Sequence, residues 1–251
     1  MKTTRNMLTV VMVIAAIGVL AVTAQAATIG VNDPLVTSLG LSEGDIFHLA
    51  FVTSTTRDAT DTGIGAYNTF VNDVANATGS TVKDYGWTWK AIAQTVDNPD
   101  ARVNTGTVYS AENPGNPIYL GGPTYSLVAS GNKKLWTQLS HAIDSTEKGE
   151  TVADTTTVWT GNMWNRAGGR LGGTPDSCYA KVSTMVSYGG QWAYFWYAAS
   201  TVKKPILAMS EAVQIVPEPE PSIIPEPATM AMVSLAACGL GGYVRRRRKL
   251  A

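Results

Sequence analysis

The sequence predicts an α+β fold for one folded body, residues 27–215, placed between two targeting segments. Short apolar segments such as 46–53 and 205–213 have strand composition, whereas residues 61–77 carry apolar side chains at helical spacing. Strands and helices mix without a regular β-α-β alternation, which argues against a doubly wound sheet. A body of roughly 190 residues can bury a stable core without disulfides.

The first two elements follow from periodicity. Residues 46–53 are expected to form a strand with Phe47, Leu49 and Phe51 on one face. Residues 61–77 are expected to form a helix, with Asp61 as its N-cap and Gly79 at its C-terminal stop. Its apolar residues recur at spacings of three and four: Ile64, Tyr67, Val71 and Val74.

Residues 84–95 alternate again, which places four side chains on one side of a predicted strand: Trp87, Trp89, Ala91 and Ala93. The later elements are shorter. We expect strands at 117–120, 156–160, 192–199 and 205–213, a helix at 132–139, and a long glycine-rich, flexible loop at 161–176.

The N-terminal segment, residues 1–26, has the layout of a secretory signal peptide. Lys2 and Arg5 precede an uninterrupted run of apolar or small residues from 8 to 22, and Ala24 and Ala26 are the small residues of a signal peptidase site. We expect cleavage after Ala26. A permanent anchor is the alternative, but the run is shorter than the roughly 20 residues of a comfortable membrane span.

The C-terminal segment changes composition abruptly. Residues 216–227 form a linker rich in proline and glutamate, which is predicted to be an extended spacer. Residues 228–244 carry no charge and predict a short transmembrane helix of about 26 Å. The basic residues of 245–251 would hold that end in the cytoplasm, so the body would face outward as an ectodomain.

This order of features resembles the PEP-CTERM sorting signal. The matching residues are Pro225, Glu226 and Pro227, the apolar segment, and the cluster Arg245, Arg246, Arg247 and Arg248. The resemblance implies two processing partners, signal peptidase and an exosortase-type enzyme. It also implies membrane tethering through the C-terminal helix, and then delivery to the cell surface or extracellular matrix. An ordinary tail anchor on a proline-rich stalk is the alternative.

A second resemblance covers residues 45–215. The matching segments are 86–91, 100–102, 117–120, 135–136, 158–161 and 207–209. They resemble the bacterial relatives of the C-type lectin-like and endostatin-like domains, which implies a single lectin-like ectodomain. The disulfide cysteines of animal members are missing, leaving only Cys178 in the body, which we expect to be buried. The sugar-and-calcium motifs are also missing, so calcium-dependent sugar binding is not implied.

Charge and composition exclude several functions. The body holds 12 basic and 16 acidic side chains, a net charge of −4, which disfavours nucleic acid as a partner. We predict no catalytic residue, no cofactor and no metal site. His48 is expected to be structural. Two carboxylate pairs, Asp58 with Asp61 and Asp97 with Asp100, could serve glycoside hydrolysis only if folding brought a pair across a cleft. Asp61 and Asp97 are expected to be helix N-caps instead, and an oxygen-ligand calcium site near residues 97–100 is a further alternative.

Tryptophan is the suggestive excess, with seven in the chain. Four are expected in the core: Trp87, Trp89, Trp136 and Trp159. Trp164, Trp192 and Trp196 are the candidate ligand contacts, because exposed aromatic faces stack on sugars or on protein partners. Three hypotheses stay open: a non-enzymatic surface protein that binds extracellular polysaccharide or protein, an extracellular glycan hydrolase, and a structural coat component.

Overall fold

The structure is a computed structural model, and it describes residues 27–98, 100–122, 124–161, 169–173, 175–182, 185–186 and 196–218. Its fold is mixed α and β, mostly sheet with few helices, as the sequence predicts. The helices are α1 (Pro34–Leu39), α2 (Ile64–Ala75), α3 (Ala101–Thr105), α4 (Asn132–Thr137) and the 3₁₀ turn η1 (Lys83–Tyr85). The strands are β1 (Ala27–Gly30), β2 (Ile46–Val52), β3 (Trp89–Ala91), β4 (Ile118–Leu120), β5 (Leu127–Ala129), β6 (Thr157–Trp159), β7 (Asp176–Lys181), β8 (Trp196–Ala199), β9 (Leu207–Ser210) and β10 (Val213–Val216).

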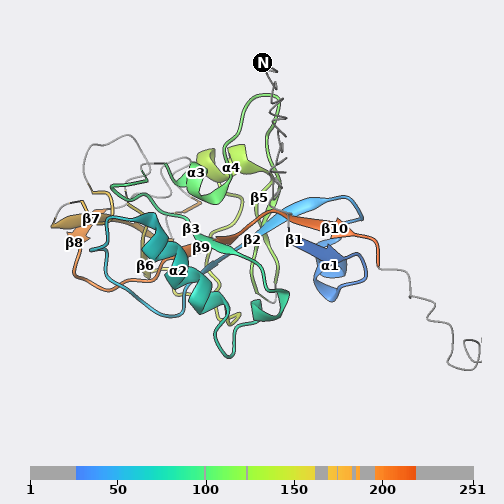
Figure 1. Ribbon diagram of the computed structural model, residues 1–251, viewed down its shortest axis with the longest axis horizontal. Helices are drawn as coiled ribbons and strands as arrows, with labels where there is room; N and C mark the ends of the chain where they lie inside the picture. Colours follow the sequence, from blue (N-terminus) through green and yellow to red (C-terminus); the bar gives the residue numbers. More distant parts are fainter. Residues whose placement is uncertain are drawn as a thin grey trace, which may run out of the picture.

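The described strands form a seven-stranded sheet and a three-stranded sheet (Figure 1). In the large sheet, β2 is central. Along one edge, the first residues of β2 pair with β10 and its last residues pair with β9, and both pairings are antiparallel. Along the other edge, β2 pairs with β4 in parallel. β1 extends the sheet by pairing in parallel with β10, so the body begins well before the first strand that the sequence predicts. The small sheet has the order β6-β7-β8.

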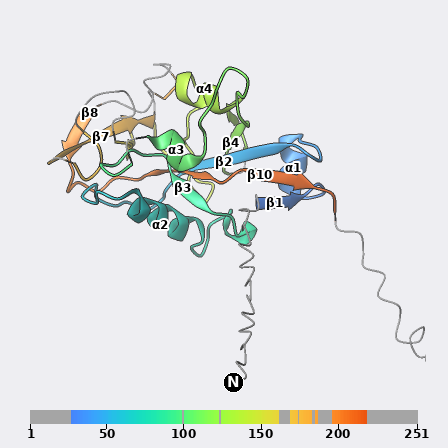
Figure 2. The same cartoon turned by 45° about the horizontal axis from the view of Figure 1, so that its top comes forward.

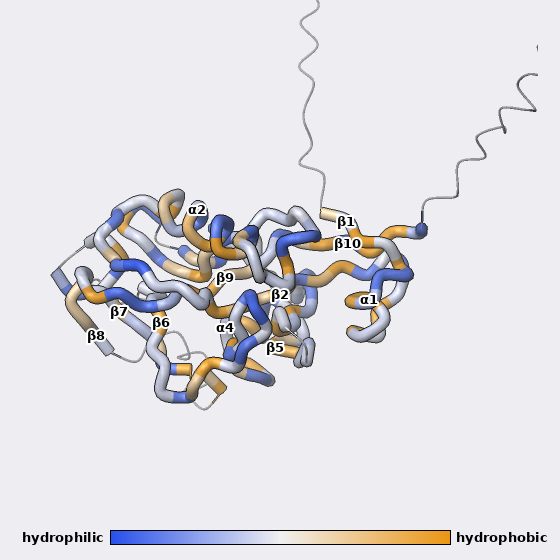
Figure 3. The backbone as a smooth tube through the Cα atoms, turned by 90° about the horizontal axis from the view of Figure 1, so that it is seen from below, coloured by the Kyte–Doolittle hydropathy of each residue, from blue (hydrophilic) through white to orange (hydrophobic). Residues whose placement is uncertain are grey.

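β2 confirms the predicted strand at 46–53 and is buried on both faces. Phe47, Leu49 and Phe51 lie in one hydrophobic cluster, whereas Ala50 and Val52 lie in a second cluster on the opposite face. β2 is buried on both faces because α2 covers one face of the central strands and α4 lies on the other (Figures 2 and 3). Apolar colours run along the central strands between these two helices (Figure 3).

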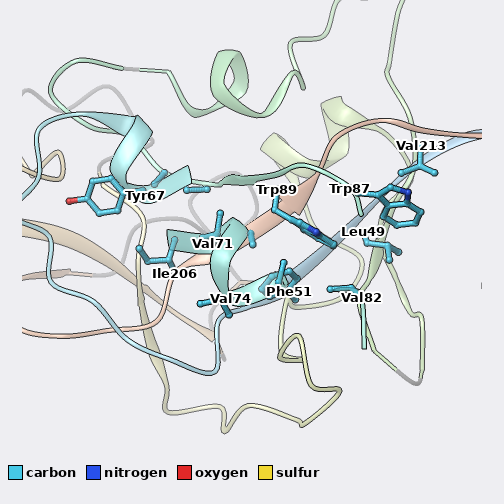
Figure 4. Packing of buried hydrophobic residues seen from close by; sticks show 14 of the residues in the cluster. Leu49, Phe51, Tyr67, Val71, Val74, Val82, Trp87, Trp89, Ile206 and Val213 are labelled. Atoms are coloured by element: carbon cyan, nitrogen blue, oxygen red, sulfur yellow. The ribbon is translucent and has the colours of Figure 1, made fainter. Parts of the chain in front are cut away.

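α2 confirms the predicted helix, and it packs Tyr67, Val71 and Val74 against the first face of the sheet (Figure 4). The predicted caps are wrong. The N-cap is Gly63 and the C-cap is Asn76, so neither Asp61 nor Gly79 has the expected role. Gly63 offers no side-chain cap, whereas Asn76 N and Asn76 Nδ2 both donate to Asn72 O at the C-terminal end.

The predicted strand at 84–95 is only partly confirmed. Hydrogen bonding to β9 extends over the three residues of β3, and residues 83–85 form a 3₁₀ turn instead. The other edge of β3 is capped by side chains of α2, because Asn68 Oδ1 accepts from Ala91 N at 2.9 Å and Asn72 Oδ1 accepts from Trp89 N at 3.2 Å. The prediction that four side chains lie on the same side of this segment is confirmed, because all four are buried in the first cluster: Trp87, Trp89, Ala91 and Ala93.

The shorter predicted elements are found with small changes of boundary. β4, β6 and α4 fall within the ranges expected for them. The expected final strand at 205–213 is two strands, β9 and β10, separated by Glu211 and Ala212. Glu211 follows β9, and it stays bonded to the segment before β3: its backbone N–H donates to Thr88 O at 2.9 Å, and its carboxylate accepts from Thr88 N at 2.8 Å. For the predicted strand at 192–199, β8 lies at its end and residues 192–195 fall outside the described residues.

His48 is the buried histidine of β2, and its Nδ1 lies 2.9 Å from Ser210 O. This confirms a structural, hydrogen-bonded histidine. Burial lowers the pKa of His48 below its ordinary value of 6.5, although bonds to the backbone at Ser210 and Glu211 act in the opposite direction. The folded chain therefore keeps the ring neutral at a pH where the unfolded chain protonates it.

This lowered pKa predicts that the protein loses stability as the pH falls. Below about pH 6.5 the unfolded state binds more protons than the folded state, so the free energy of unfolding falls as the pH drops toward the folded-state pKa of His48. We expect the denaturation midpoint to decrease between about pH 7.5 and 5.5 in the parent, and to decrease less in His48→Gln. His141→Gln, which changes a half-exposed ring, is the control. Equal pH dependence in the parent and His48→Gln would contradict this prediction.

Candidate ligand-binding surface on the small sheet

Trp196, a predicted ligand contact, lies at the end of an aromatic row that crosses the small sheet. Trp159 of β6 is in register with Tyr179 of β7, and Tyr179 is in register with Trp196 of β8. Directly opposite residues on antiparallel strands share one face. The three side chains therefore form one row, which we call the aromatic row.

The aromatic row runs from the core to the surface. Trp159 is fully buried, Tyr179 is half-buried, and the Trp196 side chain is 63% exposed. The inner end is held firmly, because Trp159 Nε1 donates to Arg57 O at 3.1 Å and to Val202 O at 3.2 Å, and the Trp159 ring meets Tyr179 edge to face at 6.4 Å. The outer end offers a flat ring on a strand, the kind of surface that binds a sugar ring or an apolar partner.

Lys204 covers the middle of the aromatic row. Its Nζ lies 4.4 Å from the centre of the Tyr179 ring and 5.3 Å from the centre of the Trp159 ring, and it donates to Thr157 Oγ1 at 2.8 Å. Burial lowers the pKa of Lys204 below its ordinary value. Contact with two aromatic faces partly compensates a desolvated ammonium group, and it fixes the position of the cation.

Arg57 connects this end of the molecule to α2. The backbone N–H and C=O of Arg57 exchange hydrogen bonds with Lys204 at 3.0 and 3.1 Å. Its guanidinium lies 4.3 Å from the centre of the Tyr67 ring, donates to Ala66 O at 2.7 Å, and forms an ion pair with Asp61. Asp61, the predicted N-cap, thus neutralises Arg57 instead.

The other tryptophans divide as follows. Trp87, Trp89 and Trp159 are buried, as predicted. Trp136 is half-buried, and its Nε1 donates to Thr107 Oγ1 at 3.0 Å. Trp164 and Trp192, the other two candidate ligand contacts, lie outside the described residues, so Trp196 is the candidate whose surroundings the structure defines.

The glycine-rich segment, which is expected to be a flexible loop, approaches its neighbours closely at Gly169 and Gly172. Gly172 has a φ of 76°, and a side chain there would meet Asp61 O at 2.2 Å. Gly169 has a φ of 91°, and a side chain there would meet the Sγ of buried Cys178 at 2.2 Å. Glycine is needed at both positions because the backbone adopts a left-handed conformation against close neighbours.

In each predicted carboxylate pair, one member has a pKa below its ordinary value. The Thr60 hydroxyl bonded to Asp58 lowers the pKa of that carboxyl, and the Arg102 guanidinium does the same for Asp100. A general acid needs the opposite shift. Asp97 accepts from Thr62 Oγ1 at 3.3 Å, and its predicted role as N-cap is wrong, because Asp100 caps α3.

For a metal ion, the described part of the chain contains no group of three or more His, Cys, Asp and Glu side chains that would hold one.

The segments that are predicted to direct targeting lie outside the described residues. These are the leader with Ala24 and Ala26, most of the linker, the predicted span 228–244 and the basic cluster, together with the sorting residues Pro225, Glu226 and Pro227. Within the described residues, the helices are too short or too polar to cross a bilayer. The start of the linker is defined: Val31 N donates to Val216 O at 2.9 Å, and the Glu218 carboxylate lies beside Gly30.

No protein-family model matches this chain, and no curated protein matches it either. A function has to be argued from the targeting segments and from the geometry of the small sheet.

Sequence reasoning missed Tyr179, Lys204 and Thr157 as members of this surface. β7 is short and mixes small, polar and aromatic residues, so its sequence does not resemble a strand strongly. The sequence did carry one indication of this surface, namely that basic residues are concentrated in the segment that forms the small sheet.

Proposed function

We propose that this chain is an exported cell-surface or matrix protein whose ectodomain binds polysaccharide without catalysis. The observation that carries the proposal is the exposed Trp196 ring, held on a strand and backed by Tyr179. A large flat ring that is 63% exposed leaves apolar surface in contact with water, and a sugar ring that stacked on it would bury that surface.

The arrangement of the molecule supports an outward-facing role. The small sheet lies at one end, and β10, which leads into the linker, lies at the other (Figures 1 and 2). A body tethered through its linker at Val216 would therefore present the aromatic row away from its attachment point.

The proposed route rests on the two targeting segments. Signal peptidase would remove residues 1–26, the helix 228–244 would hold the chain in the membrane, and an exosortase-type enzyme would process the tail. The support is the order of unlike features: a Pro-Glu-Pro motif, an uncharged segment and an arginine cluster.

The finer fold within the α+β class is proposed to be C-type lectin-like or endostatin-like. Its support is that four of the matching segments contain strands of one body, namely β3, β4, β6 and β9, and the other two contain residues of α3 and α4. Because the calcium motifs are missing, sugar binding in this proposal depends on aromatic contact.

Trp196→Ala is expected to weaken polysaccharide binding by about 30-fold, the equivalent of about 2 kcal/mol for a dominant aromatic contact. Trp196→Phe, which keeps a flat ring, should retain most of the affinity. The measurement is affinity electrophoresis or titration against soluble polysaccharides, with product analysis in the same samples. Equal binding by the parent and Trp196→Ala would contradict the proposal, and released oligosaccharide would favour the hydrolase alternative.

A further inference from the structure

Basic and acidic side chains are distributed unevenly along the sequence of the body. Residues 157–210, which form the small sheet and the strand after it, hold 5 basic side chains and 1 acidic side chain. The rest of the body, residues 27–156 and 211–215, holds 7 basic and 15 acidic side chains. The aromatic row therefore belongs to a segment that is richer in basic side chains than the rest of the body, and these cations would attract an anionic ligand.

Lys204 brings one of these charges onto the row itself. Among the described residues, no carboxylate lies within 4.0 Å of its Nζ, because the ion pairs there are Arg57 with Asp61, Arg102 with Asp100, and His141 with Asp144. Its contacts are two aromatic rings and the Thr157 hydroxyl. A half-buried ammonium group without a counterion is unfavourable, and an anion from a ligand would relieve that cost.

The cation and the exposed ring are close enough to act together. Lys204 covers the Tyr179 ring, which leaves Trp196 as the open ring of the row. Tyr179 and Trp196 are in register on neighbouring strands, which lie about 4.8 Å apart. A sugar that lies on Trp196 would therefore have its substituents beside Lys204.

We propose that the aromatic row takes an anionic polysaccharide of the uronate type, with a sugar ring on Trp196 and its carboxylate at Lys204. This proposal rests on the proposed function and names the ligand class of the same surface. Lys203, the exposed neighbour of Lys204 in the chain, interacts with the Asp58 carboxylate, so Lys204 is the cation that the row itself offers. Nucleic acid fits less well, because the remaining body is strongly acidic and a phosphate polymer needs many cations along its path.

The test compares polygalacturonate with its methyl-esterified form, which keeps the sugar ring and removes the charge. All proteins are full chains in which glutamine replaces Arg245, Arg246, Arg247 and Arg248, so that these arginines contribute no binding. We expect the parent to bind the acid form about tenfold more tightly than the ester. In Lys204→Gln this preference should be lost, while the affinity for the ester should stay unchanged. Lys204→Arg should keep the preference, and Lys148→Gln, an exposed lysine outside the basic segment, is the matched control.

Each outcome has a separate meaning. Equal binding of acid and ester would overturn the anionic ligand and leave the proposed function standing. Binding of neither form, with Trp196→Ala equal to the parent for every polysaccharide, would overturn both. Tighter binding of single-stranded poly(dT) than of polygalacturonate would replace the polysaccharide by nucleic acid. The acid and ester forms are compared with a protein that has no substitution in the aromatic row. A Lys204→Gln protein that folds poorly therefore does not affect this comparison.

Discussion

Replacing Trp87 with alanine is expected to lower the free energy of unfolding by about 3–5 kcal/mol. The Trp87 side chain is 4% exposed, meets Phe47 edge to face at 6.1 Å, and stacks on Tyr85 at 4.4 Å. Truncation removes these contacts and leaves a cavity that the surrounding sheet cannot fill by collapse. Chemical denaturation, followed by near-UV circular dichroism, measures the effect.

The matched control is the same substitution at Trp196, whose ring is mostly in solvent. Trp196→Ala should cost less than about 1 kcal/mol, because surface substitutions rarely cost more. A loss below about 1 kcal/mol for Trp87→Ala would contradict the core position of this residue. A large loss at Trp196 would instead show that its role is structural, and it would weaken the case for a ligand surface.

Removal of the arginine cluster is expected to abolish normal processing of the tail. Changing Arg245, Arg246, Arg247 and Arg248 to glutamine removes the charges that fix the depth and direction of a short, glycine-containing span. Without them the predicted helix has little to stop it from passing through the bilayer. We therefore expect this variant in the medium with its tail uncut.

Changing Pro225, Glu226 and Pro227 to alanine is expected to block processing in a different way. This motif lies outside the apolar segment and cannot act through membrane depth, so a protein must recognise it in an extended form. The variant should accumulate uncut in the membrane. Fractionation, with mass determination of the C-terminal and N-terminal fragments, separates the two phenotypes and also tests whether the mature chain begins at Ala27.

The upstream copy of the motif, 217–219, provides a matched control of the same composition. Its first residues directly follow β10, at whose end Val216 O accepts from Val31 N, and the Glu218 carboxylate lies beside Gly30. Alanine at this copy should leave processing unchanged. If both test variants are cut and released like the parent, the sorting interpretation is wrong and a plain tail anchor replaces it.

The elements with strong periodicity were predictable. β2 and α2 were found from alternation and from spacings of three and four, because each presents a continuous apolar face whatever packs against it. His48 was correctly expected to be structural from its apolar neighbours. The helix caps failed, since Asp61 is bound to Arg57 and Asp97 is bonded to Thr62, contacts that no local pattern indicates.

The candidate surface was only partly predictable. Trp196 was singled out by its aromatic, strand-like segment, and the structure places it on the surface. Its neighbours Tyr179 and Lys204 come from 17 residues before it and 8 residues after it in the chain, and strand pairing and cation–π contacts bring them together. Trp159, expected in the core, is the buried start of the same row.

By itself the sequence determined the mixed α and β class, the one-sided apolar patterns of β2 and α2, and the composition of both targeting segments. These are local properties, in which each residue type acts through its own backbone preference and its own transfer from water. The tertiary structure alone decided that β1 pairs with β10, that β2 is buried on both faces, and that Lys204 lies over the aromatic row. Such contacts join residues far apart in the chain, and they form only where packing of the whole body outweighs the entropy of closing the intervening segments.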